Sequence, residues 1–266
     1  MKYKENFMEW EDPGVALITG ASSGIGAEFA RQLASQGFDL ILIARRKERL
    51  ETLSRQLQET FSVIAEVFVG DLSNIDNNYN IVSKIKETNN LDILINNAGY
   101  GINDTFLQID VSEHIDMINV HFTSAVMFCH AAIPGMMKRE RGVIINTSST
   151  AAIHKSPMSV MYTSTKSALT VFSEILQEKV KNSNIRIQSL CPGFTYSEFH
   201  DTDSMRGFQR SWFPKESWMA SEDVVRLSLN AVQNGDIVFV PGDINQDYTK
   251  KIRESTVEQY LNGKRL

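Results

Sequence analysis

Residues 19–26 read Thr-Gly-Ala-Ser-Ser-Gly-Ile-Gly, a glycine-rich turn between an apolar run and a helix-like segment. The run is Val15–Ile18, and the segment is Gly24–Gln36, which stops at Gly37, a residue suited to a helix C-terminus. Glycines let a chain turn sharply and approach a ligand without a Cβ clash, and the helix N-terminus that follows offers free N–H groups. The turn therefore predicts a phosphate-binding strand–loop–helix unit, although a glycine-rich turn that binds nothing would look similar.

Alternating strand-like and helix-like segments continue through most of the 266 residues. The strand-like runs are rich in β-branched residues and lack polar–apolar alternation, so both of their faces are expected to be buried. Between them lie amphipathic segments such as Lys47–Thr60, with Leu50, Leu53 and Leu57 on one stripe. This order predicts an α/β fold: a single Rossmann-type, doubly wound parallel sheet of about seven strands with helices on both faces. The expected strands are Val15–Ile18, Leu40–Ala44, Val63–Val69, Leu91–Ile95, Val143–Ile145, Ile185–Leu190 and Ile237–Val240.

The composition narrows the class of protein. No repeat or linker divides the chain, so residues 1–266 are expected to form a single domain. The net charge is −5 and no basic stripe is present, which argues against nucleic-acid binding. Cys129 and Cys191 are expected to be buried, reduced thiols. Met1–Trp10 lacks the apolar core of a signal peptide, and no run approaches the roughly 20 apolar residues of a membrane span, so a cytoplasmic protein without a span is expected.

The glycine turn also points to a family. Its spacing, Thr-Gly-x-x-x-Gly-x-Gly, departs from the common dinucleotide pattern Gly-x-Gly-x-x-Gly. With it, the chain resembles the short-chain dehydrogenase/reductase family from about Val15 to Gly242. The resemblance implies that a nicotinamide dinucleotide lies with its pyrophosphate on the turn. The implied contacts in the turn are Gly20, Ser22, Ser23, Gly24, Ile25 and Gly26.

Three more segments resemble those that line the cofactor site in the family (the cofactor wall), and each falls where an expected strand ends. They are Asp71-Leu72 beside the adenine, Asn96-Asn97-Ala98-Gly99 after the fourth strand, and Pro192-Gly193 at the nicotinamide. Parallel strands bring their carboxyl ends to one rim, so this placement supports the resemblance independently. The implied contacts are Asp71, Leu72, Asn97, Ala98, Gly99, Pro192, Gly193 and Thr195, while Ser197 stands where the family commonly has Thr.

The residue after the second strand distinguishes NAD from NADP. A carboxylate there binds the ribose 2′-hydroxyl, whereas an arginine accommodates a 2′-phosphate. Arg45 and Arg46 follow Leu40–Ala44, and Asp39 lies at the opposite end of this strand. We therefore predict NADP(H), with Arg45 on the phosphate and Arg46 stacking on the adenine or sharing the charge. The alternative is that both arginines only solubilise the next helix.

Tyr162 and Lys166 are four residues apart in Met161–Val180, a segment with helical periodicity. This spacing places both side chains on one helix face. A phenol with an ordinary pKa near 10 is a poor acid at neutral pH, and a neighbouring ammonium would lower that pKa. Tyr-x-x-x-Lys alone is common in helices. In the family, however, this pair is catalytic, which implies that Tyr162 is the proton donor and that Lys166 also holds the nicotinamide ribose.

The resemblance implies two further catalytic residues. The family places its catalytic serine thirteen residues before the tyrosine, which selects Ser149 and leaves Ser148 as a polar strand-end residue. Asn119 matches the residue that kinks a helix and holds a water in a proton relay to the lysine. An ordinary, partly buried asparagine is the alternative for Asn119. The histidines form no i, i+4 pair, so no metal site is expected.

The implied reaction is reduction of a carbonyl: NADPH supplies hydride, Tyr162 supplies a proton, and Ser149 stabilises the oxygen. The substrate is a ketone, an aldehyde or a 3-oxoacyl thioester. It is expected to be covered by an aromatic lid at Phe199–Trp218, whose basic residues are Arg206, Arg210 and Lys215. A homodimer or homotetramer is implied as well. The competing function is an NADP(H)-binding redox sensor without turnover.

Overall fold

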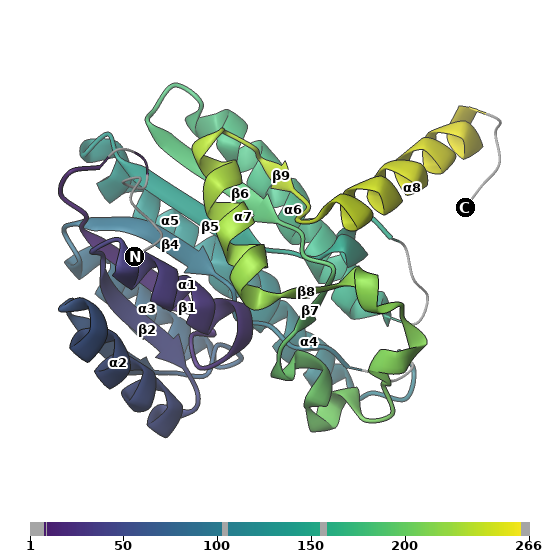
Figure 1. Ribbon diagram of the computed structural model, residues 1–266, viewed down its shortest axis with the longest axis horizontal. Coiled ribbons are helices and arrows are strands. Elements are labelled where there is room, and N and C mark those ends of the chain that lie inside the picture. The colour runs from purple at the N-terminus through teal and green to yellow at the C-terminus, as the bar shows by residue number, and fades with distance from the viewer. Residues whose placement is uncertain (1–7, 9, 103–105, 155–158, 262–266) are drawn as a thin grey trace.

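The computed structural model describes residues 8, 10–102, 106–154 and 159–261. Seven strands form its central sheet in the order β3-β2-β1-β4-β5-β6-β9, with every neighbouring pair parallel (Figure 1). The predicted fold class is thereby confirmed. The strands are β1 (Val15–Thr19), β2 (Asp39–Ala44), β3 (Ala65–Val69), β4 (Leu91–Asn96), β5 (Gly142–Thr147), β6 (Ile185–Leu190) and β9 (Val238–Phe239).

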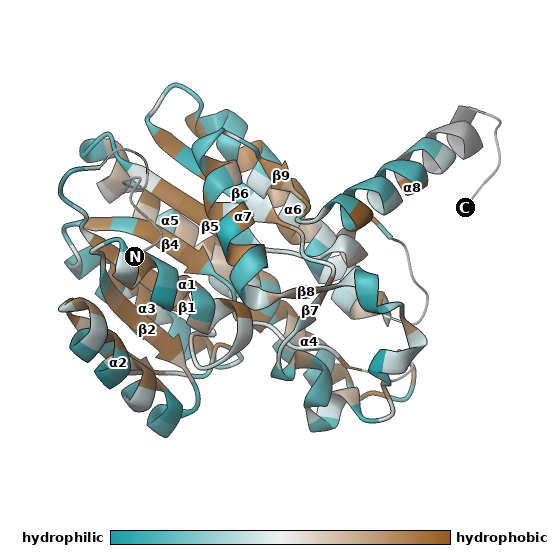
Figure 2. Ribbon diagram, in the orientation of Figure 1, coloured by the Kyte–Doolittle hydropathy of each residue, from teal (hydrophilic) through white to brown (hydrophobic). Residues whose placement is uncertain are grey.

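Helices cover both faces of the sheet, and each face has its own apolar layer. Leu17 and Ile18 are neighbours in β1, yet Ile18 packs in the layer under α1, α2 and α7, and Leu17 in the layer under α3, α5 and α6. Burial on both sides explains why the strands read as continuous apolar runs, drawn brown in Figure 2. The helices are α1 (Gly24–Ser35), α2 (Lys47–Phe61), α3 (Ile75–Glu87), α4 (Val111–Ile118), α5 (Ser124–Lys138), α6 (Val160–Val180), α7 (Ser221–Gln233) and α8 (Asp243–Leu261).

A π-helical turn at Asn119–Thr123 joins α4 to α5. The combined stretch, Val111–Lys138, is long and apolar enough by length and composition to cross a membrane, with a mean hydropathy of 1.2. This corrects the expectation that no segment approaches such a span. Core helices pass the same test, and Phe128 and Met136 of α5 are fully buried against the sheet.

The lid region follows β6. Two short strands, β7 (Phe194–Tyr196) and β8 (Trp218–Ala220), pair in parallel and hold its two ends together. Helix α8 then projects away from the body (Figure 1). Helix α7 begins at Ser221, whose hydroxyl donates to the Tyr196 carbonyl at 3.0 Å.

Candidate active site

The glycine turn owes its shape to backbone conformations and distances that only glycine tolerates. Gly20 and Gly24 have φ of +68° and +53°, in the left-handed region that side chains disfavour. At Gly26 a Cβ would lie 2.3 Å from the Gly20 oxygen and 2.5 Å from Asn97 Nδ2. The Ser23 side chain makes no capping bond to α1, so the N–H groups of the first helical turn remain available. The turn therefore fits a pyrophosphate at a helix N-terminus.

Hydrogen bonds tie this turn to the end of β4. Thr19 Oγ1 accepts from the backbone N–H groups of Asn97 (2.9 Å) and Ala98 (3.0 Å). Asn97 Nδ2 in turn donates to the Thr19 carbonyl at 3.1 Å. The glycine turn and the Asn-Asn-Ala-Gly segment thus form one continuous rim at the carboxyl ends of the central strands.

The structure brings Ser149, Tyr162 and Lys166 together beside this rim. Ser149 follows β5, and its hydroxyl interacts with the Tyr162 phenol of α6 closely enough to affect the pKa of that phenol. Lys166 lies one turn further along α6, with Nζ 5.8 Å from the Tyr162 ring centre. Lys166 Nζ donates to the Thr147 carbonyl at the end of β5, at 2.8 Å. Ser148 instead faces away, because its hydroxyl donates to the Lys166 carbonyl.

Burial controls the protonation of this cluster. Desolvation raises the pKa of Tyr162 above its usual value of 10.0, against a smaller lowering by the Ser149 hydrogen bond. Desolvation also lowers the pKa of Lys166 to about 8. The lowering of the Tyr162 pKa predicted from Lys166 is not seen in this arrangement: burial raises that pKa, and the Lys166 ammonium is directed at the Thr147 carbonyl. A phenol with a raised pKa is held protonated, the form that donates a proton to a carbonyl.

Asn119 begins the π-helical turn that follows α4. Its Nδ2 donates to the Ser73 carbonyl at 3.2 Å, which ties this turn to the loop after β3. The same loop carries Asp71, whose Oδ1 accepts from the N–H (3.0 Å) and hydroxyl (2.9 Å) of Ser73. The kink expected at Asn119 is present as this π-helical turn, and its part in a proton relay stays a prediction.

The nicotinamide end of the predicted wall lies beside Ser149. The Pro192 carbonyl accepts from the N–H of Thr150 at 2.9 Å, and the Thr195 hydroxyl donates to the Gly193 carbonyl at 3.1 Å. A Cβ on Gly193 would lie 2.5 Å from Asn245 Oδ1 of α8. A side chain at position 193 would therefore have to displace Asn245, and the start of α8 closes this end of the rim. Ile25 and Leu72 are the remaining predicted contacts. Ile25 packs against the apolar layer under α1, α2 and α7, and Leu72 lies within the layer under α3, α5 and α6.

The two arginines that follow β2 do not lie where they were predicted to lie. Arg46 Nη2 donates to the hydroxyls of Ser22 (3.0 Å) and Ser23 (2.9 Å), so this guanidinium lies on the glycine turn. Arg45 instead extends toward Asp71, with Nη1 3.9 Å from Oδ2. Arg46 is thus the arginine beside the turn, and Arg45 lies on the side expected for the adenine.

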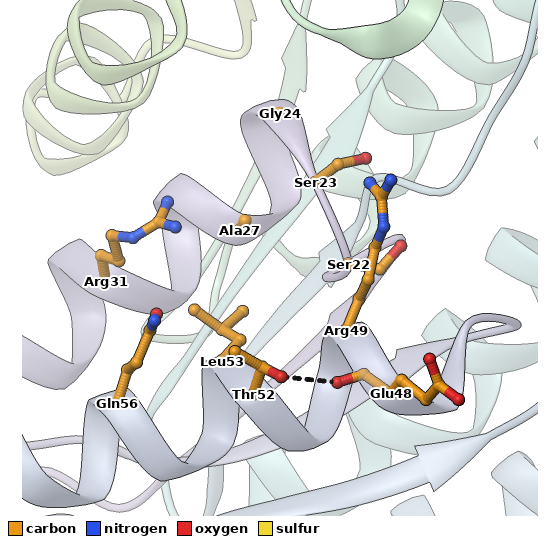
Figure 3. A pocket seen from close by; sticks show the side chains of 10 residues that line it. All are labelled: Ser22, Ser23, Gly24, Ala27, Arg31, Glu48, Arg49, Thr52, Leu53 and Gln56. Atoms are coloured by element: carbon orange, nitrogen blue, oxygen red, sulfur yellow. Dashed lines mark hydrogen bonds between the residues drawn. The ribbon is translucent and has the colours of Figure 1, made fainter.

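Arg49, from the first turn of α2, also reaches this place and was missed by the sequence reasoning. Figure 3 shows its guanidinium near Ser22 and Ser23, at a hollow of about 420 Å³ between α1 and α2. Arg46 and Arg49 both bind the carboxylate of Glu198 in the lid, Arg46 with an Nη1–Oε2 distance of 2.8 Å. The only sequence signal for Arg49 was its spacing of one helical turn from Arg46.

The lid contains an aromatic cluster that lies over Tyr162. The Phe199 ring centre is 5.9 Å from that of Tyr162. Phe194 stacks on Trp218, and Phe208 contacts both of them with tilted or edge-to-face geometry. Two of the three basic lid residues are already paired within the lid: Arg210 with Asp201 at 2.6 Å and Arg206 with Asp203 at 3.8 Å. The lid therefore presents mainly apolar surface toward Tyr162.

His121 is a second residue of this site that sequence reasoning missed. It was expected to be an ordinary histidine, yet its side chain is buried and its ring lies 5.6 Å from that of Tyr162. The available signal was its place two residues after Asn119 in the same helical segment.

Comparison with known proteins gives a consistent result. The family model described as short chain dehydrogenase matches residues 14–206. Over 217 residues the chain is 33% identical to hydroxysteroid dehydrogenase-like protein 1 of Gallus gallus, covering 81% of this chain and 66% of that protein. Over 181 residues it is 33% identical to very-long-chain 3-oxoacyl-CoA reductase of Anas platyrhynchos, covering 66% and 58%.

A third relative is the inactive hydroxysteroid dehydrogenase-like protein 1 of Homo sapiens, 32% identical over 179 residues, covering 66% of this chain and 54% of that protein. The chain thus spans between about half and two thirds of the length of these three relatives.

Solved structures agree on the fold. A short-chain dehydrogenase from Sphingobium yanoikuyae in complex with NADPH has a TM-score of 0.81 at 27% identity, covering 93% of this chain and 95% of that one. L-sorbose reductase from Gluconobacter frateurii, complexed with NADPH and L-sorbose, has a TM-score of 0.76 at 26% identity, covering 86% and 95%.

Proposed function

Because this chain belongs to the short-chain dehydrogenase/reductase family, we propose that it is an NADP(H)-dependent enzyme that reduces a carbonyl group to an alcohol. One observation carries the proposal: Ser149, Tyr162 and Lys166 lie together beside the rim formed by the glycine turn and the end of β4. A nicotinamide cofactor held on that rim would supply hydride chemistry beside the Tyr162 phenol.

Each residue of the cluster has a separate task. Bound NADPH supplies the hydride that the carbonyl carbon receives. The Ser149 hydroxyl donates a hydrogen bond to the carbonyl oxygen and orients it. Tyr162, kept protonated by burial, transfers its proton to this oxygen as negative charge develops. Lys166 would hold the nicotinamide ribose, and solvent would return the proton to Tyr162.

The lid and the relatives support a proposal for the substrate class. The aromatic surface over Tyr162 favours an apolar or medium-sized carbonyl compound. One relative is named a 3-oxoacyl-CoA reductase, and a structural neighbour holds a sugar ketone. We therefore propose a ketone, an aldehyde or a 3-oxoacyl thioester as substrate.

The experiment is NADPH oxidation, followed by absorbance, against a panel of ketones, aldehydes and 3-oxoacyl thioesters. Turnover of at least one class supports the enzyme. Some relatives are named inactive, which keeps a non-catalytic NADP(H) sensor as the second candidate. Tight NADPH binding with no turnover of any class favours that sensor.

The preference for NADP(H) is supported by Arg46, which donates to the Ser22 hydroxyl, and by Arg49, because both guanidiniums bind one carboxylate, that of Glu198. Arg46→Ala is expected to weaken NADPH binding by roughly ten- to a hundredfold, since a hydrogen bond to a charged group contributes about 1.5–3 kcal/mol. NADH, which lacks the 2′-phosphate, is expected to bind as in the wild type. Fluorescence titration with both cofactors measures this, and an unchanged NADPH-to-NADH ratio contradicts the assignment.

Glu198→Gln is the matched variant, with the opposite expected effect on NADPH binding. The Glu198 carboxylate binds the same two guanidiniums that the phosphate would use, so its removal is expected to strengthen NADPH binding up to about fivefold. The effect is small because exposed ion pairs contribute about 0.2–1 kcal/mol each. Weaker NADPH binding by this variant would show that Glu198 helps rather than competes.

We also propose a homodimer or homotetramer and a cytoplasmic location. The assembly is supported by exposed apolar side chains on α4 and α6, namely Val111 and Ile115 on α4 and Val171 and Ile175 on α6.

A further inference from the structure

His121 lies at the junction of three elements of the candidate site. It belongs to the π-helical turn Asn119–Thr123, and only 2% of its surface is exposed. On one side, Nε2 is 3.1 Å from the backbone nitrogen of Tyr100, the residue after the Asn-Asn-Ala-Gly segment. On the other side, Nδ1 is 3.0 Å from Oγ1 of Thr165 in α6.

These two contacts determine the state of the ring. A backbone N–H can only donate, so Nε2 of His121 is the acceptor and the proton of the neutral ring is on Nδ1. The Nδ1–H group then donates to Thr165 Oγ1, whose own hydroxyl donates to the carbonyl of Met161 or Tyr162. Both nitrogens are used for structure, so His121 has none left to carry protons for the reaction. Burial and the neighbouring Lys166 ammonium both lower its pKa, which favours the same neutral form.

The ring also fixes spacing in the site. Its ring centre lies 5.6 Å from that of Tyr162 and 5.5 Å from that of Tyr100, both in edge-to-face geometry. A Cβ on Gly99 would lie 3.2 Å from His121 Nε2 and 3.3 Å from Lys166 Nζ, so these groups crowd one small space. The two hydrogen-bond partners are one residue from Gly99 and one residue from Lys166. His121 therefore connects the cofactor rim directly to the helix that carries the proton donor.

We propose that His121 is a positioning residue that sets the distance between the Gly99 edge of the cofactor rim and the Tyr162–Lys166 pair. The inference rests on the proposed carbonyl reduction, because only there does this distance control the approach of the phenol to the reacting oxygen. Small displacements of reacting groups cost large factors in rate, whereas cofactor binding depends on the whole rim. A loss in kcat larger than the loss in NADPH affinity is thus the signature of this role.

Three variants test the link that His121 makes, through its two hydrogen bonds, between the cofactor rim and α6. His121→Phe keeps the ring and loses both hydrogen bonds, so kcat is expected to fall at least about tenfold while Kd for NADPH changes less than about threefold. His121→Gln keeps an acceptor within reach of Tyr100 N–H and is expected to recover part of the loss. Thr165→Val removes only the other partner and is expected to lower kcat as well. Combined with His121→Phe it should add little, because both changes break one link.

Controls separate positioning from misfolding and from failure of the proposed function. His130→Phe, on an exposed face of α5, is expected to keep wild-type kcat. Equal melting temperatures show that a variant is folded. Wild-type kcat in His121→Phe overturns the inference, as does an equal loss in kcat and NADPH affinity. Absence of turnover in the wild-type protein overturns the proposed function instead. Imidazole nitrogen NMR of the wild type then still decides, because a ring protonated on Nε2 overturns the link whatever the activity.

Discussion

Tyr162→Phe is expected to bind NADPH like the wild type and to lose turnover by a factor on the order of 10²–10⁴. The substitution removes one oxygen and leaves the ring contacts with His121 and Phe199 in place. What disappears is the proton that the carbonyl oxygen receives and the partner of the Ser149 hydroxyl. The measurement is kcat with the best substrate of the panel, together with the NADPH dissociation constant.

Tyr79→Phe is the matched control for this variant, since Tyr79 is 60% exposed on α3, away from the cluster. Wild-type kcat in Tyr162→Phe would show that the phenol is not the proton donor.

The pH dependence of the reaction gives a second check of the role of Tyr162. Reduction needs the protonated phenol, whose pKa is raised by burial, so its rate should persist through neutral pH and fall only as pH rises through that pKa. Oxidation of the alcohol needs the phenolate and should show the opposite slope.

Gly26→Ala is expected to have the second-largest effect, on cofactor binding and on stability together. The added Cβ would meet the Gly20 oxygen and Asn97 Nδ2, and the Asn97 amide is held by its bond to Thr19. Neither group can move without opening the turn, so the start of α1 must shift. Overpacking of this kind lowers the free energy of unfolding by about 1–3 kcal/mol. We expect NADPH affinity to fall by roughly a hundredfold, because the phosphate-binding N–H groups move with the helix.

Urea unfolding and NADPH titration measure the two effects of this variant. Gly135→Ala in α5 is the control, because its Cβ would approach Arg139 Nη1 at 3.4 Å, an ordinary contact distance. It is expected to stabilise the protein by about 0.5–1 kcal/mol, as alanine does inside a helix. NADPH affinity within threefold of the wild type in Gly26→Ala would show that the turn tolerates a side chain.

Most of the fold could be predicted because its signals are local. Runs such as Leu40–Ala44 are buried on both faces, and glycines such as Gly37 end helices where the chain must turn left-handed, here with φ of +90°. The thiols expected to be buried, Cys129 and Cys191, are both fully buried. The short last strand was harder to delimit, because only Val238 and Phe239 find a partner in β6.

The site residues that escaped prediction depend on side chains meeting across the fold. Arg49 approaches Glu198 over 149 positions of sequence, and His121 meets Thr165 over 44. Nothing near either residue in the chain indicates its partner. The pKa of Tyr162 was misjudged for the same reason: the spacing of Tyr162 and Lys166 was known, but the depth of burial was not.

The hydrogen bonds between Thr19 and Asn97 also determine when the site can form during synthesis of the chain. During synthesis, β1 can pair with β2 early, but its other neighbour, β4, follows some seventy residues later. The rim proposed to hold a dinucleotide is therefore complete only after residue 98 has been made, and Tyr162 of α6 is added later still. A nascent chain paused between these points would form a nucleotide-binding half with an uncovered edge at β4, where β5 later pairs.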